Sequence, residues 1–229
     1  MKPAELSLVI PLFNEEENVV SLLNVLTSAL KKEGISYEVL AVDNGSMDNT
    51  GDLIDKFSKK CRNVIKIKVK ENKGYGFGVL SGLKKAKGKY IGYLWGDNQI
   101  SPKTTIQVFK KLKKENLDLC KITRIERTES LLRIIQSMIY NLLVKLLFGV
   151  DSKDMNGCPK IFKKEAYEKL NPESKDWFLD AEIMIKLKKN NLKFGEISVV
   201  SKDREGGKSS VSLLTGFEFL KNIFKYRFI

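Results

Sequence analysis

One carboxylate and two amides follow an apolar segment near the middle of this chain of 229 residues. Residues 90–95 have the apolar and aromatic composition of a buried strand, and Gly96 interrupts them before Asp97, Asn98 and Gln99. In open α/β sheets, ligands bind just beyond the carboxyl ends of the strands. A strand that ends in oxygens able to hold a metal ion is therefore a candidate site, provided that other strands end at the same edge.

Four strand–helix units account for the first half of the chain. A buried strand over 6–12 is followed by Asn14 to Glu17, which predict an N-cap and an acidic first turn for a helix to about Lys32. The later units comprise strands at 38–43, 64–69 and 90–95, with helices from Asp48 to about Lys60, over 79–86, and from Pro102 to about Glu115. Such repetition predicts an α/β fold with a mostly parallel central sheet flanked by helices.

The second half departs from this pattern. A fifth strand at 117–123 leads to Arg124, an antiparallel strand is expected within 154–162, residues 178–182 open another helix, and 194–200 form a last strand. Residues 204–210 read as a basic loop. Residues 211–229 form an amphipathic C-terminal helix with Phe224 on its apolar stripe. That helix could dock on an anionic membrane surface, on its own domain or on a second copy of the chain.

Residues 131–150 form a long apolar helix with polar side chains at successive steps of four. These are Arg133, Ser137, Asn141 and Lys145. The helix is too short and too polar on one face to span a bilayer, which requires about 20 apolar residues. Two interpretations stay open: a core helix packed on the sheet, or an interfacial helix partly immersed in lipid.

Composition narrows the classes of function. The chain has no histidine, which excludes Ser-His-Asp hydrolases and zinc enzymes with histidine ligands. Its three cysteines are far apart and without metal-ligand spacing, which fits a reducing cytoplasm, and its N-terminus predicts no signal peptide. The net charge of +13 indicates an anionic partner. No nucleic-acid motif accompanies that charge, so we expect no nucleic-acid partner.

Several motifs, in the right order over nearly the whole chain, resemble the inverting family 2 glycosyltransferases. They are Pro11 to Glu15, Val42 to Thr50, the glycine-rich Asn72 to Gly78, and Gly88 to Ile91 running into Asp97–Gln99. The second half is similar to the polyprenyl-phosphate sugar transferases. The resemblance implies the Rossmann-like GT-A fold of nucleotide-diphospho-sugar transferases. Its catalytic domain would span 1–210, divided into a nucleotide-sugar-binding half (1–123) and an acceptor half (124–210), followed by the helix at 211–229.

The resemblance also implies site residues. Those that bind the nucleotide sugar would be Pro11, Asn14, Glu15, Asp43, Gly74 and Asp97, with Arg204, Lys208 and Ser209 from a loop that closes over the diphosphate. Gly74, Gly76 and Gly78 would let the backbone approach a ligand closely, although an ordinary loop explains them too. For Asp43, the competing explanation of helix capping fails, because the residue ends its strand two positions before Gly45.

Catalysis would involve Asp97, Arg124, Arg133, Ser137 and Asp180. Arg124, Arg133 and Ser137 match an acceptor-phosphate cradle, and Asp180, with Glu182, matches an acidic pair that serves as base or positioning group; helix capping by Asp180 is the alternative. Asp97 and Gln99 would hold Mg²⁺ or Mn²⁺ together with diphosphate oxygens and water.

The chain departs from the family pattern at this site. Trp95 stands where the family has the first of two carboxylates, and Asn44 stands where it often has a second aspartate. Both changes remove negative charge, so we expect weaker metal binding.

The expected function is transfer of a hexose from a nucleotide-diphosphate sugar to polyprenyl phosphate, at the cytoplasmic face of a membrane. One alternative is a family 2 transferase with a glycan hydroxyl acceptor and Asp180 as base, because a hydroxyl needs a base whereas a phosphate is already an anion. The other is a non-catalytic homologue that binds nucleotide sugar or lipid, which the residues at 44 and 95 suggest.

Overall fold

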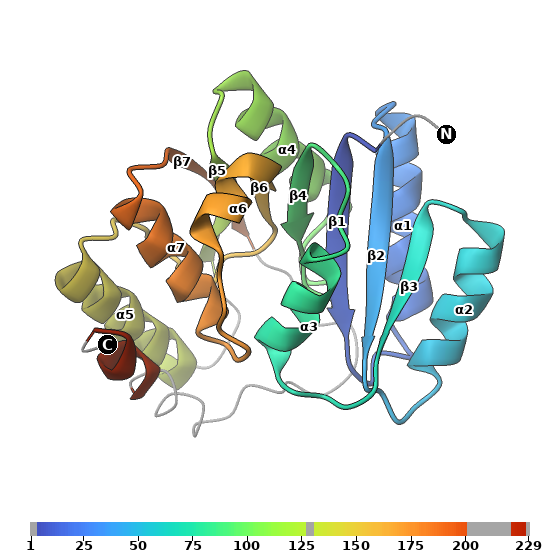
Figure 1. Ribbon diagram of the computed structural model, residues 1–229, viewed down its shortest axis with the longest axis horizontal. Coiled ribbons are helices and arrows are strands. Elements are labelled where there is room, and N and C mark those ends of the chain that lie inside the picture. The colour runs from blue at the N-terminus through green and yellow to red at the C-terminus, as the bar shows by residue number, and fades with distance from the viewer. Residues whose placement is uncertain (1–3, 127–130, 201–220, 228–229) are drawn as a thin grey trace.

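The computed structural model describes residues 4–126, 131–200 and 221–227 (Figure 1). The elements in chain order are β1 (Leu6–Leu12), α1 (Val19–Lys32), β2 (Tyr37–Asn44), α2 (Thr50–Lys60), β3 (Val64–Val69), α3 (Tyr75–Leu83), β4 (Tyr90–Tyr93), α4 (Pro102–Lys114), β5 (Leu119–Glu126), α5 (Leu131–Phe148), β6 (Lys160–Lys163), α6 (Lys164–Leu170), α7 (Leu179–Lys189) and β7 (Phe194–Val200).

A seven-stranded sheet, in the order β3-β2-β1-β4-β6-β5-β7, runs through both predicted halves of the chain. The predicted boundary between residues 123 and 124 falls inside β5. Every pairing is parallel except those of β6, which runs antiparallel to both β4 and β5. Because two reversals restore the direction, β5 points the same way as β4. The carboxyl ends of β1 to β5 therefore share one edge, at the bottom of Figure 1.

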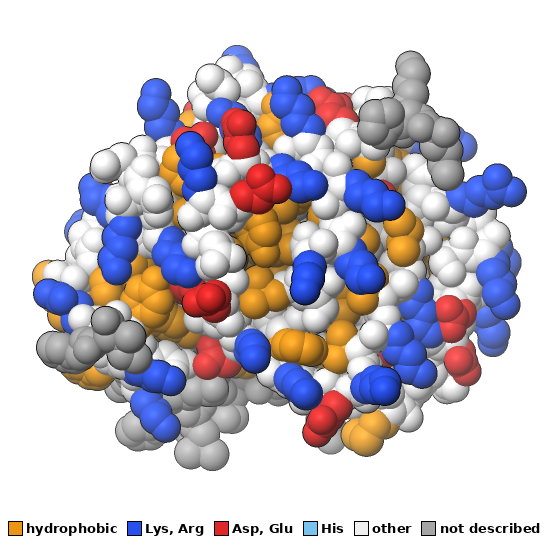
Figure 2. All heavy atoms as spheres, in the orientation of Figure 1, with side chains coloured by type: hydrophobic (Ala, Val, Ile, Leu, Met, Phe, Trp, Pro, Cys, Tyr) orange, Lys and Arg blue, Asp and Glu red, His pale blue; other side chains and the backbone are white. Residues whose placement is uncertain are grey.

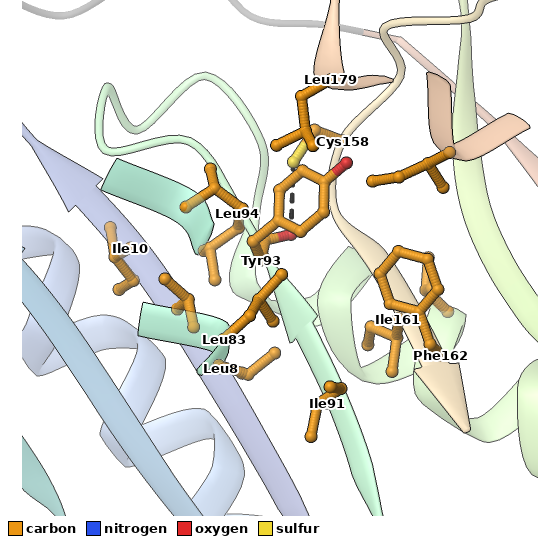
Figure 3. Packing of buried hydrophobic residues seen from close by; sticks show 14 of the residues in the cluster. Leu8, Ile10, Leu83, Ile91, Tyr93, Leu94, Cys158, Ile161, Phe162 and Leu179 are labelled. Carbon is orange, nitrogen blue, oxygen red and sulfur yellow. Dashed lines mark hydrogen bonds between the residues drawn. The ribbon is translucent and has the colours of Figure 1, made fainter. Parts of the chain in front are cut away.

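Helices cover both faces of the sheet, which explains why β1 and β4 at its centre are largely apolar. Figure 1 shows α3 in front of β1 and β2, with α1 behind them. The core continues across the β4–β6 pairing, where Tyr93 packs on Phe162 with ring centroids 6.1 Å apart (Figure 3). Ile91, which is paired with Phe162, lies on the same face of the sheet, while Leu8 and Ile161 lie on the opposite face; all three are fully or almost fully buried. The donor and acceptor sides are thus joined by a continuous core.

Two predicted helices begin elsewhere, and one helix was not predicted. The first helix begins at Val19 and not in the stretch 14–17, where the side chains of Asn14 and Glu16 bind a neighbouring loop instead. The third begins at Tyr75 and not at 79, so Gly76 and Gly78 lie inside it. Helix α6 was not predicted, because its seven residues are too few for a clear periodicity.

Helix α5 packs on the domain with one face and exposes the other, and its contact with lipid stays a prediction. Tyr140 and Val144 are buried against the domain. The opposite face is apolar and exposed, with Leu131, Leu132, Ile135, Met138, Ile139, Leu142 and Leu146. Figure 2 shows hydrophobic side chains gathered in the region that α5 occupies in Figure 1, with lysine and arginine side chains around them. No helix within the described ranges is long and apolar enough to cross a membrane.

The described part of the C-terminal helix, residues 221–227, docks on its own domain. Ile223 is fully buried, and Tyr226 packs between Phe148 and Phe178 with ring centroids 6.1 and 5.4 Å away. Phe224, a member of the predicted apolar stripe, is exposed instead. The contact face in this part is therefore offset from the predicted one.

Candidate active site

The loops after β1 and β2 brace each other at the carboxyl edge. Asn14 adopts a left-handed conformation (φ 53°), which asparagine tolerates better than most residues. Its Oδ1 accepts a hydrogen bond from the backbone N–H of Met47 at 2.9 Å, and its own N–H donates to Ser46. Glu16 accepts from the backbone and side chain of Asn49. These bonds explain the polar run after β1 as a link between loops.

Two predicted nucleoside-binding carboxylates lie on these loops. Asp43, 5% exposed at the end of β2, accepts a hydrogen bond from the N–H of Ser46 at 3.0 Å. Glu15 accepts from the side chain of Asn18, and its backbone N–H donates to Thr50. Both carboxylates are thereby fixed in orientation before any ligand binds.

An open hollow of about 380 Å³ includes Glu15 but not Asp43 in its lining, which consists of Asn14, Glu15, Glu16, Glu17, Asn18, Met47 and Asp48. Its carboxylates repel a diphosphate but can accept hydrogen bonds from a neutral base or ribose. The hollow therefore suits the nucleoside end of a donor.

The start of the glycine-rich segment approaches protein backbone rather than an open ligand space, which corrects the prediction for Gly74 and Gly76. A Cβ on Gly74 would lie 2.4 Å from the carbonyl oxygen of Lys175, and one on Gly76 would lie 2.4 Å from that of Ser174. Asn44 holds this segment from the other side by donating to the carbonyl of Gly74 at 3.2 Å. The glycines thus let the start of α3 pack against residues 174–176.

We expect Gly76→Ala to destabilise the protein by about 1–3 kcal/mol, because overpacking against backbone exceeds the helix propensity that alanine gains. The measurement is the free energy of unfolding in denaturant. Gly34→Ala is the control: Gly34 has φ 65° and no atom within 4 Å of the place a Cβ would take, so it reports conformational strain without overlap. A Gly76→Ala variant as stable as the wild type would contradict the packing argument.

Asp97 and Gln99 lie at the same edge, beyond β4. The backbone N–H of Gln99 donates to Asp97 Oδ1 at 3.2 Å, and Asn98 between them has φ 60°. Gly96 brings this turn against the end of β1: a Cβ there would lie 3.2 Å from the carbonyl oxygen of Pro11. The predicted metal ligands therefore adjoin the predicted donor-binding strand.

The donor set fits a divalent ion held mainly by non-protein ligands. In the described parts of the chain, no three acidic or cysteine side chains gather as a metal-binding group. Asp97 supplies one carboxylate and Gln99 one amide, both hard oxygen donors of the kind that Mg²⁺ and Mn²⁺ accept beside phosphate and water. This arrangement agrees with the reduced charge expected from Trp95.

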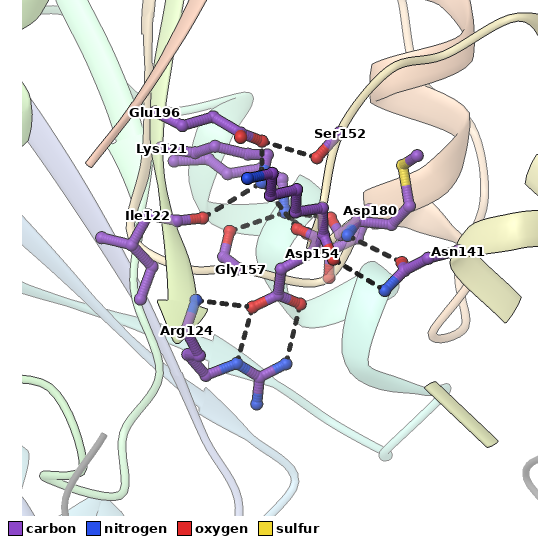
Figure 4. Close-up of polar contacts among 12 residues, drawn as sticks. Lys121, Ile122, Arg124, Asn141, Ser152, Asp154, Gly157, Asp180 and Glu196 are labelled. Carbon is purple, nitrogen blue, oxygen red and sulfur yellow. Dashed lines mark hydrogen bonds and ion pairs between the residues drawn. The ribbon is translucent and has the colours of Figure 1, made fainter. Parts of the chain in front are cut away.

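Arg124, at the end of β5, is held by Asp154 in a two-point ion pair (Figure 4). Its Nε lies 2.8 Å from Asp154 Oδ2 and its Nη2 2.9 Å from Oδ1, while its backbone N–H also donates to Oδ2. Burial alone would raise the pKa of Asp154, but the hydrogen bonds and charge of Arg124 lower it below its ordinary value. The guanidinium also lies over the ring of Trp95, 5.0 Å from its centroid.

Lys121 supports the loop that carries Asp154. It is fully buried, donates to the carbonyl oxygens of Ile122 and Asp154, and pairs with Glu196 at 2.8 Å (Figure 4). Burial, and then repulsion from Lys160, lower the pKa of Lys121. A charged lysine can be buried in an apolar strand only because such partners compensate its charge.

Asp180 is a buried member of the same region. It is 2% exposed, accepts a hydrogen bond from the Tyr93 hydroxyl at 2.7 Å and forms an ion pair with Lys160. Lys160 also donates to the carbonyl oxygens of Met155 and Gly157, both at 2.9 Å. No side-chain capping bond forms at the start of α7, so the capping alternative for Asp180 is wrong. Its contacts suit positioning of the 155–157 loop.

The predicted polar stripe of α5 has a divided role. Asn141 donates to the carbonyl of Lys153 and accepts from the N–H of Met155, both at 3.0 Å, so it anchors the loop next to Asp154. Ser137 is partly buried one turn earlier. Arg133 lies within α5, but its side chain is outside the described residues, as are Arg204, Lys208 and Ser209.

Sequence reasoning missed Lys121, Asp154 and Lys160. The sequence did contain a signal for the two lysines. Lys121 interrupts the apolar strand predicted at 117–123, and Lys160 lies in the segment 154–162, where another strand is predicted. A lysine at a core position of a strand predicts a buried anionic partner. The identity of that partner depends on how β6 is inserted between β4 and β5.

Comparisons with known proteins identify the family and the fold of this chain. Residues 7–171 match the family model described as glycosyl transferase family 2. An undecaprenyl-phosphate 4-deoxy-4-formamido-L-arabinose transferase from Serratia proteamaculans is 27% identical over 92% of this chain and 64% of its own length. A dolichyl-phosphate β-glucosyltransferase from Dictyostelium discoideum is 26% identical over 97% of this chain and 74% of its own length. The chain thus spans only about two thirds to three quarters of these relatives.

Solved structures confirm the fold. Glucosyl-3-phosphoglycerate synthase from Mycobacterium tuberculosis, in complex with Mn²⁺ and UDP-glucose, superposes with a TM-score of 0.76 at 17% identity, covering 98% of this chain and 79% of that one. Mannosyl-3-phosphoglycerate synthase from Rubrobacter xylanophilus gives a TM-score of 0.79 at 15% identity, covering 98% and 74%. The predicted GT-A nucleotide-sugar transferase fold is therefore confirmed.

Proposed function

Because this chain belongs to glycosyl transferase family 2, we propose that it transfers a hexose, with inversion, from a nucleotide-diphosphate sugar to polyprenyl phosphate. The observation that carries the proposal is the placement of Arg124 at the same sheet edge as Asp97, immediately before the exposed apolar helix α5. A cation at the donor edge, followed in the chain by a helix with an exposed apolar face, matches an acceptor that has a phosphate head and a lipid tail. The two relatives named for undecaprenyl-phosphate and dolichyl-phosphate support the same acceptor class.

In this proposal the donor lies along the carboxyl edge of β1, β2 and β4. Asp43 and Glu15 accept hydrogen bonds from the base and ribose, with Pro11 and Asn14 shaping the surface around them. Asp97 and Gln99 face the diphosphate and would hold Mg²⁺ or Mn²⁺ there. When bound, that ion neutralises the charge that develops on the leaving diphosphate. Arg204, Lys208 and Ser209 remain proposed diphosphate contacts from the 204–210 loop.

The reaction is a single displacement. An oxygen of the acceptor phosphate attacks the anomeric carbon as the bond to the diphosphate oxygen breaks, so the nucleoside diphosphate leaves with the bonding electron pair. The phosphate is already an anion at neutral pH, so no base is required. Arg124, Arg133 and Ser137 orient it and compensate its charge. Asp180, buried and paired with Lys160, acts as a positioning group in this scheme.

The exposed face of α5 supplies the lipid contact in this proposal. Leu131, Met138, Leu142 and Leu146 present apolar surface without a partner in the described chain, and the net charge of +13 favours an anionic bilayer. The protein would then sit peripherally on the cytoplasmic leaflet, with the acceptor phosphate entering beside Arg124.

The test is a transfer assay with UDP and GDP hexoses, undecaprenyl phosphate in anionic vesicles, and Mn²⁺ or Mg²⁺. We expect one sugar to appear on the lipid phosphate, with inverted anomeric configuration by NMR of the product. Transfer to a glycan hydroxyl but not to the lipid would favour the hydroxyl-acceptor alternative. Tight nucleotide binding without any turnover would instead identify a non-catalytic homologue.

We expect Leu142→Glu to weaken binding to phosphatidylglycerol vesicles by about tenfold or more, because a leucine that enters lipid contributes about 1.5–3 kcal/mol. Leu142 is 54% exposed, so its replacement leaves the core intact. Val25→Glu is a matched control, since Val25 is 51% exposed on α1, behind the sheet. Equal losses in a vesicle co-sedimentation assay would contradict docking through α5.

A further inference from the structure

The guanidinium of Arg124 is restrained from two directions. Asp154 grips one edge of it through Nε and Nη2, and it lies over the ring of Trp95, 5.0 Å from the ring centroid. The side chains of Arg124 and Asp154 are 9% and 4% exposed, so water competes little for this ion pair. A two-point ion pair fixes the orientation of the guanidinium plane. An aromatic ring beneath the group restrains its movement away from the ring face.

The three residues come from parts of the chain that meet only through the sheet. Trp95 follows β4, Arg124 lies near the end of β5, and Asp154 lies in the loop that enters β6 between them. That loop is itself anchored by Lys121 on the carbonyl of Asp154 and by Asn141 on its neighbours. Asp154 therefore has a stable support independent of Arg124.

The chemistry at position 95 matters because a carboxylate there would be a second anion close to the guanidinium. It would compete with Asp154 for Arg124 and draw the cation toward β4. An indole ring attracts the cation without accepting its N–H groups, so the ion pair with Asp154 is preserved. The residue that weakens the metal position thus strengthens the placement of Arg124.

We propose that Trp95 and Asp154 are positioning residues that hold the guanidinium of Arg124 for the acceptor's phosphate. This inference rests on the proposed function for the identity of that phosphate, but the restraint itself is a property of the unliganded protein.

The first experiment measures kcat/KM for undecaprenyl phosphate in Asp154→Asn and Trp95→Phe, each made in the wild-type and in the Arg124→Ala background. Asp154→Asn should lower kcat/KM about ten- to a hundredfold, which corresponds to one charge-assisted hydrogen-bonded pair. Trp95→Phe, which keeps an aromatic face, should lower it about two- to fivefold. The KM for the lipid should rise more than the KM for the nucleotide sugar. In the Arg124→Ala background, Asp154→Asn and Trp95→Phe should cause no further loss of kcat/KM. If each substitution lowers kcat/KM equally in both backgrounds, the proposal is overturned.

Trp95→Asp separates this role from a damaged metal site. If position 95 acts through Arg124, this variant loses about tenfold or more in activity even at saturating Mn²⁺, because the new carboxylate disrupts an ion pair. A gain in activity and tighter Mn²⁺ binding would show that position 95 serves the metal instead. Asp151→Asn is the control, since Asp151 forms an exposed ion pair with Lys145 close by in the sequence, and its activity should stay unchanged.

A measurement without ligand distinguishes failure of the proposed restraint on Arg124 from failure of the proposed function. The chain has two tryptophans, so Trp177→Phe leaves Trp95 as the sole indole reporter. Adding Arg124→Ala or Asp154→Asn should shift Trp95 emission to longer wavelength and increase its quenching by acrylamide. Unchanged emission in both would overturn the restraint. A changed emission in a protein that never glycosylates polyprenyl phosphate would refute the acceptor while leaving the restraint in place.

Discussion

Replacing Asp97 with asparagine is expected to lower the rate of sugar transfer by about a hundred- to a thousandfold, the cost of removing one electrostatic contact from a developing anion. Asparagine has nearly the same shape, and its side-chain oxygen can still accept the N–H of Gln99. The turn should therefore persist, and the lower transfer rate should result only from the loss of the negative charge. The measurement is the transfer rate at saturating donor, over a range of Mn²⁺ concentrations.

The effect should be large because Asp97 is the single carboxylate that the Trp95–Gln99 turn offers to an ion. Calorimetric binding of the nucleoside diphosphate should lose its dependence on Mn²⁺ in the same variant. Gln99→Glu makes the opposite change, and we expect it to tighten Mn²⁺ binding. Asp52→Asn, at an exposed carboxylate on α2, is the control and should leave both readouts unchanged. Full activity in Asp97→Asn would place stabilisation of the leaving group on the basic side chains instead.

The elements that carry the donor side could be predicted from the sequence because local signals agree there. Strands β1 and β3 begin and end where the apolar pattern predicts, and Pro102 starts α4 as expected. The carboxyl edge follows from that order alone. The sequence therefore predicts Asp43 and Asp97 at the same edge of the sheet.

Contacts between distant segments could not be predicted in the same way. The start of α3 was misplaced because glycines usually break helices, whereas Gly76 is needed so that residues 174–176 can pack against it. The contact of Trp95 with Arg124 depends on a short antiparallel strand between their own strands. Position 95 was therefore interpreted only as a lost ligand.

Replacing Lys160 with methionine is expected to destabilise the protein by about 3–5 kcal/mol, because it leaves the charge of Asp180 buried without its cation. Lys160 is fully buried, and its loss also leaves the carbonyl oxygens of Met155 and Gly157 without a donor. The measurement is the free energy of unfolding in denaturant. Asp180→Asn should likewise be destabilising, since it leaves the cation buried with only neutral partners.

The double variant Lys160→Met with Asp180→Asn tests whether the charges act as a pair. Asparagine can still accept the Tyr93 hydroxyl, so we expect the double variant to lose less stability than the sum of the two single variants. The exposed pair of Lys145 and Asp151 provides the comparison, because its side chains are 56% and 84% exposed and its removal should cost no more than about 1 kcal/mol. Additive losses at Lys160 and Asp180 would show that the charges are independent.

Lys160 also links stability to the proposed chemistry. Its hydrogen bonds hold residues 155–157, which adjoin Asp154, the ion-pair partner of Arg124. If the loop relaxes in Lys160→Met, the transfer rate should fall even at temperatures where the variant remains folded, and the KM for the lipid phosphate should rise. Asp154 and Arg124 would then be displaced together, so Asp154→Asn should cause little further loss in this background. A folded Lys160→Met variant with wild-type kinetics would show that the buried pair stabilises the fold without setting the geometry of the site.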